Sequence, residues 1–171
     1  MKLDLEGKSV LVTGASKGIG LATAHSFAME GVSRLHLAAR SEEGLARARK
    51  EIEEAYGAKV EIHPMDLSVT ANATALAERC RDVDVLVNNA ADSTPGPLDQ
   101  MSDQDWRSSL DMKIFSYVTL TRELYAHMKK RGSGVIVNDI GNSGENWDAN
   151  YIVGTTGNAA MMAFTRGVGG R

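Results

Sequence analysis

Short apolar runs alternate with stretches of helical periodicity along the whole chain. The pattern predicts buried strands at 9–13, 34–38, 59–65, 83–88 and 134–139. It predicts helices at 18–30, 42–56, 68–81, 102–131 and 155–168. Such alternation is typical of consecutive βαβ units, so we expect an α/β fold in which a parallel sheet carries helices on both faces.

Composition narrows the class of protein. The chain has 171 residues with 43% hydrophobic and 24% charged residues, and it shows no internal repeat or linker, which predicts a single domain over 1–171. The net charge of −3 without a basic block argues against a nucleic-acid partner. No apolar stretch is long enough for a bilayer and the first residues are too polar for a signal peptide, so we expect a cytoplasmic protein without a membrane partner.

Cysteine and histidine give no obvious metal or disulfide chemistry. Cys80 is the only cysteine, which excludes an intramolecular disulfide. The four histidines lack the spacing to cysteine or glutamate that marks common metal sites, so we predict no metal. His36, inside the second strand, is interpreted as a core histidine.

A glycine-rich turn follows the first strand and opens the first helix. It reads Thr13-Gly14-Ala15-Ser16-Lys17-Gly18-Ile19-Gly20. Glycine allows a tight turn, lets the backbone approach a pyrophosphate, and permits close packing of helix on strand, while the helix N-terminus attracts the phosphates. The turn therefore predicts a dinucleotide site.

The Gly-x-x-x-Gly-x-Gly spacing resembles the short-chain dehydrogenase/reductase family. Asn88-Asn89-Ala90-Ala91 resembles the Asn-Asn-Ala-Gly motif of that family, and Asp66 stands where the family has an adenine-contacting aspartate. The resemblance implies a Rossmann-type, doubly wound parallel sheet with strand order 3-2-1-4-5. It also implies a nicotinamide cofactor bound in the crevice between the first and fourth strands. We assign the cofactor site to Gly14, Ser16, Lys17, Gly18, Ile19, Gly20, Arg40, Asp66, Leu67, Asn89 and Ala90.

Charge at the end of the second strand favours NADP(H). NAD-binding folds place an acidic residue there for the ribose 2′-hydroxyl, whereas arginine suits a 2′-phosphate. This chain has Arg40 and no carboxylate nearby, and Lys17 adds a second cation in the turn. NAD(H) is the alternative cofactor, for the case in which Arg40 only begins a solvated helix and Lys17 is a surface residue.

The family's catalytic positions are all changed. The resemblance implies a Tyr-x-x-x-Lys pair, a serine after the fifth strand and an asparagine on the preceding helix. An ungapped register places Gly154 and Asn158 at the tyrosine and lysine, Gly141 at the serine and Lys113 at the asparagine. Lysine and asparagine are thus exchanged between two helices.

This exchange suggests a rebuilt catalytic set. In it Lys113 supplies the ammonium, Asn158 the amide, Tyr151 the phenol, and Ser143 a partner hydroxyl. The alternative is that selection for catalysis was lost and Lys113 simply reaches solvent. Asp139, at the end of the fifth strand, is either a functional carboxylate or an acceptor that tethers a loop.

Three functions follow from the resemblance. The first is an NADP(H)-dependent oxidoreductase that transfers hydride between the nicotinamide and a small carbonyl or alcohol substrate. The second is an NADP(H)-binding sensor or pseudoenzyme without turnover, and the third an interaction subunit. The resemblance also implies a homodimer or homotetramer formed through the helices at 102–131 and 155–168. Family members are longer, so we expect a C-terminally incomplete domain whose fifth strand is an exposed edge.

Overall fold

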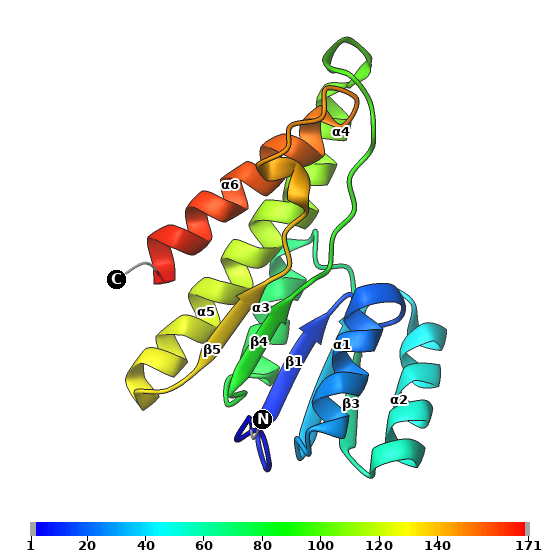
Figure 1. Ribbon diagram of the computed structural model, residues 1–171, viewed down its shortest axis with the longest axis vertical. Helices are drawn as coiled ribbons and strands as arrows, with labels where there is room; N and C mark the ends of the chain where they lie inside the picture. The colour runs from blue at the N-terminus through cyan, green and yellow to red at the C-terminus, as the bar shows by residue number, and fades with distance from the viewer. Residues whose placement is uncertain (1–2, 170–171) are drawn as a thin grey trace.

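A computed structural model describes residues 3–169, and in that range five parallel strands form one sheet of order β3-β2-β1-β4-β5 (Figure 1). The strands are β1 (Ser9–Thr13), β2 (Arg34–Ala39), β3 (Lys59–Pro64), β4 (Val85–Asn88) and β5 (Val135–Asn138). The predicted α/β class and strand order are confirmed. The order reverses between β1 and β4, which is where ligands bind in doubly wound folds.

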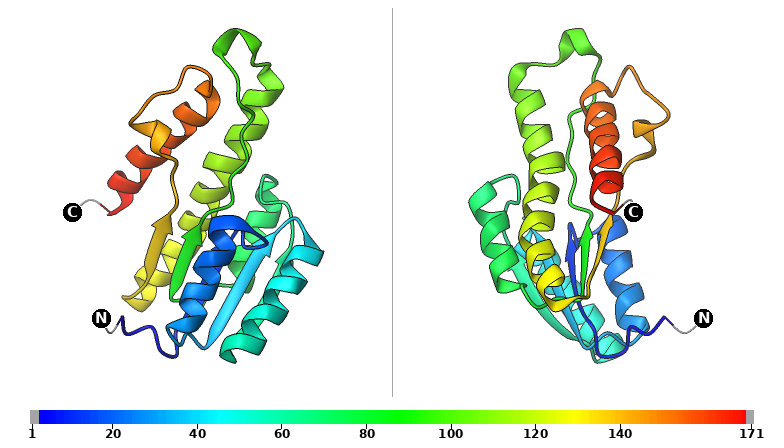
Figure 2. Two further views of the ribbon diagram at one scale, coloured as in Figure 1. Left: turned by 45° about the vertical axis from the view of Figure 1, so that its right-hand side comes forward. Right: turned by 90° about the vertical axis from the view of Figure 1, so that its left-hand side faces the viewer.

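Helices cover both faces of the sheet, as the right-hand view of Figure 2 shows. They are α1 (Gly18–Met29), α2 (Glu42–Tyr56), α3 (Thr70–Arg79), α4 (Asp103–Leu110), α5 (Ser116–Arg131) and α6 (Ile152–Gly169). Alternate side chains of the strands point to opposite faces, so β1 contributes Val10 and Val12 to the core under α1 and α2, and Leu11 to the core under α3 and α5. Burial of these two apolar layers holds the helices on the sheet.

The long helix predicted at 102–131 is interrupted. A π-helical turn, Asp111–Phe115, separates α4 from α5. The Ser116 hydroxyl donates to the Met112 carbonyl within this turn. A π turn widens the helix by one residue and is common at functional sites. The capping box predicted from Ser102 and Asp105 is present at the start of α4.

Two predicted helix boundaries were wrong. The third helix begins at Thr70 rather than 68, because the Asp66 carboxylate accepts hydrogen bonds from the backbone N–H and the hydroxyl of Ser68 and so holds a turn before the helix. The last helix begins at Ile152 rather than 155, which places Tyr151 directly before its first turn.

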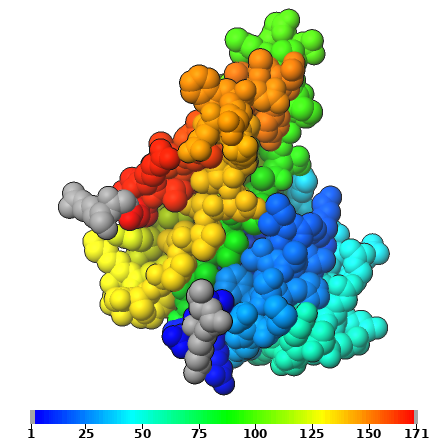
Figure 3. All heavy atoms as spheres, viewed as in Figure 1, coloured from blue at the N-terminus to red at the C-terminus, as the bar shows by residue number. Residues whose placement is uncertain are grey.

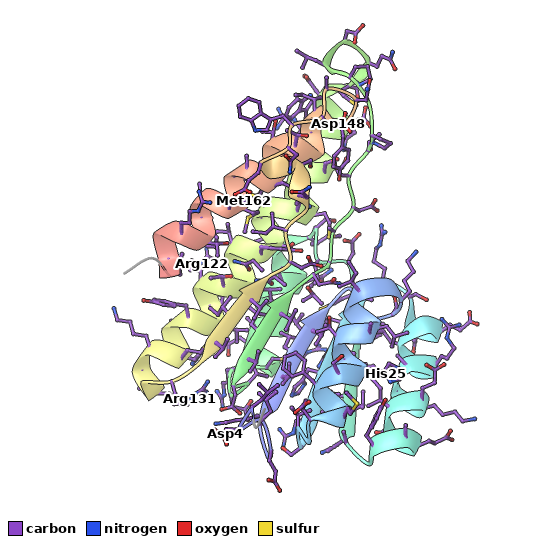
Figure 4. The ribbon with its side chains drawn as sticks, viewed as in Figure 1. Asp4, His25, Arg122, Arg131, Asp148 and Met162 are labelled. Carbon is purple, nitrogen blue, oxygen red and sulfur yellow. The ribbon has the colours of Figure 1, made fainter. Side chains whose placement is uncertain are left out.

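The fifth strand ends the sheet in the part of the chain that the structure describes, as expected. Val135 and Val137 leave 55% and 44% of their surface exposed on the side where β4 is covered by α1. The C-terminal end of α5 is attached to the loop before β4. There the Arg131 side chain donates a hydrogen bond of 2.7 Å to the Val83 carbonyl (Figure 4). Of the helices in residues 3–169, none has the length and apolar character needed to cross a bilayer.

Candidate cofactor and active site

A cleft of about 580 Å³ opens where β1 and β4 end. Its walls come from the glycine-rich turn, the ends of β2, β4 and β5, and the π turn. The residues that line it include Gly14, Ser16, Lys17, Gly18, Ile19, Arg40, Leu67, Asn89, Ala90, Met112, Lys113, Asp139 and Gly141. The structure therefore gathers most of the predicted cofactor residues, and one predicted catalytic residue, around one space.

The glycine-rich turn has the shape that a pyrophosphate needs. Gly14 and Gly18 have φ angles of +69° and +59°, in the left-handed region that glycine tolerates best. A Cβ added at Gly18 would meet no atom within 4 Å, so the backbone there borders open space. Lys17 is the N-cap of α1, and the free N–H groups of the first helical turn follow it. These residues fit a dinucleotide.

Gly20 permits close packing of α1 and does not line the cleft. A Cβ on Gly20 would lie 2.5 Å from both the Asn89 Nδ2 and the Gly14 carbonyl oxygen. The Asn89 amide in turn donates to the Thr13 carbonyl over 2.8 Å, while the Thr13 hydroxyl accepts from the backbone N–H groups of Asn89 and Ala90. This network ties the end of β4 to the turn after β1.

The two cations predicted to favour NADP(H) lie on the cleft wall. Lys17 is exposed, and Arg40 forms an ion pair of 2.9 Å with Asp92 in which both side chains are more than 60% exposed. Asp92 was not predicted from the sequence. Its only signal was its place in the loop after β4, two residues after the Asn-Asn-Ala segment.

Asp66 and Leu67, predicted together, face different spaces. Leu67 lines the cleft, whereas Asp66 lies in an adjoining hollow of about 280 Å³ together with Arg40 and Asp92. Hydrogen bonds from Ser68 hold the pKa of the Asp66 carboxyl below its ordinary value. The Asp66 Oδ1 atom accepts both of these bonds.

Lys113 is the predicted catalytic residue that the structure brings into the cleft. It comes from the π turn and is only 6% exposed, so the interpretation that it reaches solvent was wrong. Burial lowers the pKa of its ammonium, and the Asp139 carboxylate opposes this change. A Cβ on Gly157 of α6 would lie 3.0 Å from the Lys113 Cδ, which shows that the lysine stem packs against α6.

Asn158 and Ser143 are brought together beside the cleft, not in its lining. The Asn158 amide donates to the Ser143 hydroxyl over 2.7 Å, and its oxygen accepts from the Gly141 N–H over 3.1 Å. Asn158 is 1% exposed. The residue at the family's lysine position thus anchors the loop between β5 and α6.

Tyr151 lies at the entrance to α6 and is not among the residues that line the cleft. Its ring occupies the space that a side chain on Gly154 would need, since a Cβ there would overlap the ring. Its backbone forms a β-bridge with Gly96. Two hydrogen bonds between Asp148 and Thr155 close the loop that contains Tyr151 (Figure 4). Figure 3 shows this loop next to α4 at the upper end of the molecule.

Comparison with known proteins gives the family. The family model described as "short chain dehydrogenase" matches residues 8–169. The ketoacyl reductase HetN of a Nostoc strain is 33% identical over 165 residues, which are 94% of this chain and 57% of that protein. The 3-oxoacyl-[acyl-carrier-protein] reductase FabG of Vibrio harveyi is 30% identical over 97% of this chain and 71% of its own.

Solved structures agree with this assignment. The L-sorbose reductase of Gluconobacter frateurii, in complex with NADPH and L-sorbose, superposes with a TM-score of 0.93 at 28% identity, over 98% of this chain and 65% of that one. A structure described as a putative NAD(P)-dependent gluconate 5-dehydrogenase of Beutenbergia cavernae, with bound NADP, gives 0.91 at 30% identity, over 96% and 66%. The chain spans 57% and 64% of the length of HetN and of a Streptomyces coelicolor ketoacyl reductase. It belongs to the short-chain dehydrogenase family of oxidoreductases.

Proposed function

We propose that the chain binds NADP(H) in this cleft and carries out hydride transfer between the nicotinamide and a small carbonyl or alcohol. The observation that carries the proposal is Lys113, a buried ammonium on the wall of a cleft whose other end holds the glycine-rich turn. The cofactor supplies or accepts the hydride. The residues of the chain bind it, orient the reacting carbon and hold the proton that the carbonyl oxygen must gain or lose.

Preference for NADP(H) over NAD(H) rests on Arg40 and Lys17. Arg40, which follows β2, and Lys17, in the glycine-rich turn, line the same cleft and would hold the 2′-phosphate of a bound NADP(H). Arg40 must leave Asp92 to bind a 2′-phosphate, but an exposed ion pair is worth only about 0.2 to 1 kcal/mol. A charge-assisted bond to phosphate contributes about 1.5 to 3 kcal/mol, so the exchange favours the phosphate.

The proposed catalytic set is the one in which lysine and asparagine have changed places. Lys113 supplies the positive charge near the nicotinamide ribose, and its pKa, lowered by burial, makes it a better proton donor than an exposed lysine. Asn158 and Ser143 position the loop through their mutual hydrogen bond and the bond to Gly141. Tyr151 supplies the phenol that exchanges a proton with the substrate oxygen.

A second candidate is an NADP(H)-binding protein without turnover. It is favoured by the place of Tyr151 outside the cleft lining and by the complete burial of Asn158, whose side chain is already bonded to the loop. The two candidates share the cofactor and differ only in the phenol and the ammonium. Kinetics on those two residues separate them.

The test compares cofactor binding with turnover. NADPH binding is measured by fluorescence, and NADPH consumption is then followed with a panel of ketones, aldehydes and β-keto esters. We expect Tyr151→Phe and Lys113→Ala to bind NADPH and to lose most turnover, whereas Tyr125→Phe, which removes an exposed phenol from α5, changes neither. Binding without turnover in the wild type favours the second candidate, and full activity in both variants excludes the proposed catalytic set.

We also infer a homodimer or homotetramer that uses the α4–α5 helix and α6. Phe115 leaves 54% of its surface exposed along that helix, and exposed aromatic side chains are enriched at protein–protein interfaces. Light scattering after size exclusion tests this. A mass that falls to that of a monomer in Phe115→Lys supports the assignment, and a wild-type monomer contradicts it.

A further inference from the structure

Three buried side chains with metal-binding atoms meet on the sheet face under α3, away from the cofactor cleft. They are His36 from β2, His63 from β3 and Cys80 from the residue that follows α3. Their exposed fractions are 2%, 6% and 0%. None of the three lines the cleft, and the proposed oxidoreductase function does not use them.

The distances between these atoms match those around a tetrahedral zinc ion. The His36 Nδ1 lies 3.1 Å from the His63 Nε2, and the Cys80 Sγ lies 3.9 Å from the same nitrogen. Zn–N and Zn–S bonds of normal length at tetrahedral angles separate two nitrogens by about 3.3 Å and a nitrogen from a sulfur by about 3.6 Å. One donor atom of each side chain lies within 4.8 Å of the other two, so a small movement of Cys80 completes the triangle.

Hydrogen bonds alone do not pair all the donor and acceptor atoms of this cluster. In neutral histidine only one ring nitrogen carries an acceptor lone pair. The His63 Nε2 is the common neighbour of two groups, His36 Nδ1 and Cys80 Sγ, but it can accept from only one of them in good geometry. A cation placed between the three atoms would be coordinated by a lone pair from each of them.

Glu61 lies beside this cluster and has a carboxylate oxygen near His36. It precedes His63 by two residues on β3, so both side chains point to the same face. Its Oε2 lies 3.7 Å from the His36 Nδ1, while its Oε1 lies 3.9 Å from Arg34 and 3.8 Å from Lys59. The two cations thus hold one carboxylate oxygen at the surface and leave the other facing the histidines. The half-exposed Glu61 also gives a metal ion a route from solvent.

A thiol must lose its proton to become a zinc ligand, so binding at Cys80 exchanges a proton for the metal. On binding, the S–H bond breaks, the S–Zn bond forms with the same electron pair, and the proton passes to water.

We propose that His36, His63 and Cys80, with Glu61 as the fourth ligand, bind one Zn²⁺ that fastens the end of α3 to β2 and β3. Two imidazoles, a thiolate and a carboxylate form a donor set that zinc accepts readily, and a site closed by four protein ligands has a structural role. The spacing 36, 63, 80 follows no sequence motif for zinc. The ligands come from three elements that only the parallel sheet and its crossover helix bring together.

Cobalt spectroscopy on the full chain tests the proposal. Co²⁺ is titrated into metal-free protein under reducing conditions, and the near-ultraviolet band of a cobalt–thiolate bond is recorded. Because Cys80 is the only cysteine, such a band reports on this residue alone. The variants are His63→Gln and Cys80→Ser, with His127→Gln on α5 as the matched control. Zinc content is measured separately by mass spectrometry after dialysis.

We expect a tetrahedral cobalt–thiolate spectrum that saturates at one equivalent and is displaced by Zn²⁺, in the wild type and in His127→Gln. We expect no such spectrum in Cys80→Ser and a lost or much weaker one in His63→Gln, with one zinc retained per chain only in the first two proteins. Absence of the band in the wild type overturns the proposal, whether or not the variants fold. A band of unchanged strength in His63→Gln overturns it as well.

Discussion

Replacement of Arg40 by alanine is expected to weaken NADPH binding while leaving NADH binding nearly unchanged. In the free protein Arg40 is bonded to Asp92 over 2.9 Å, and both side chains are largely exposed. Binding of a 2′-phosphate therefore exchanges one ion pair for another. The gain is about 1.5 to 3 kcal/mol for the phosphate bond, and the cost is about 0.2 to 1 kcal/mol for the lost pair.

The difference sets the size of the effect. A net contribution of about 0.5 to 2.8 kcal/mol corresponds to a loss of about 2- to 100-fold in NADPH affinity, at about 1.4 kcal/mol for each factor of ten. Asp92→Asn is expected to act in the opposite direction, because it frees Arg40 and removes a negative charge near the phosphate. The gain in NADPH affinity is limited by the free energy of the exposed Arg40–Asp92 pair, which corresponds to about fivefold at most.

Isothermal titration of both cofactors against the wild type, Arg40→Ala and Asp92→Asn gives these numbers directly. Arg47→Ala is the matched control, since Arg47 lies on α2 and also forms an exposed ion pair, with Glu51. The reasoning is refuted if Arg40→Ala lowers the affinity for NADPH and NADH by the same factor, or if the wild type binds both equally. Measurements at two salt concentrations check that the effect is electrostatic.

Three further substitutions test the packing around the site. Gly20→Ala is expected to destabilise the fold by about 1 to 3 kcal/mol, read from the urea midpoint, because its Cβ would lie 2.5 Å from the Gly14 carbonyl oxygen and the Asn89 amide. Asn158→Ala removes both bonds that hold the loop after β5 and should cost about 1 to 3 kcal/mol, with faster hydrogen exchange at Gly141. Lys113→Met is expected to raise stability at pH 7. The lowered pKa means that the folded protein binds fewer protons than the unfolded chain, so wild-type stability should rise with pH toward the ordinary value of 10.5 and the variant should lack this rise.

Controls for these variants lie at exposed positions of α5 and α6. A Cβ on Gly167 of α6 would meet no atom within 4 Å, so Gly167→Ala should not destabilise the protein. Lys130→Met, which removes an exposed ammonium from α5, is the matched control for Lys113→Met. A flat pH profile in the wild type would contradict the burial of Lys113, and a stable Gly20→Ala protein would contradict the close packing of α1 on Asn89.

The strands and the glycine-rich turn could be predicted because their signals are local. A strand buried on both faces is apolar at nearly every position, as in 85–88, and Gly14 and Gly18 have φ angles that other residues adopt at a cost. The alternation of strands and helices predicted a parallel sheet, and the family resemblance supplied the strand order. Most of the residues predicted to bind the cofactor therefore line one cleft in the structure.

Features that join distant elements could not be predicted in the same way. The Arg40–Asp92 pair connects residues 52 positions apart, and nothing near either residue signals the other. The residues of the π turn are also common in α-helices, so the helix at 102–131 was predicted to be continuous. Asn158 and Tyr151 could be named as candidates from the family register, but their distance from the cleft depends on how the loop after β5 folds.

The π turn limits which changes of length this protein tolerates. Deletion of one residue between Asp111 and Phe115 would restore a continuous α-helix and improve the local hydrogen bonding. The extra residue is accommodated within the π turn, so its removal would leave α4 facing α6 and α5 facing α3. Deletion of one residue elsewhere in α5 would instead rotate one part of the helix relative to the other by about 100°. Changes of length by one residue should therefore be tolerated better inside the π turn than in the regular helix that follows it.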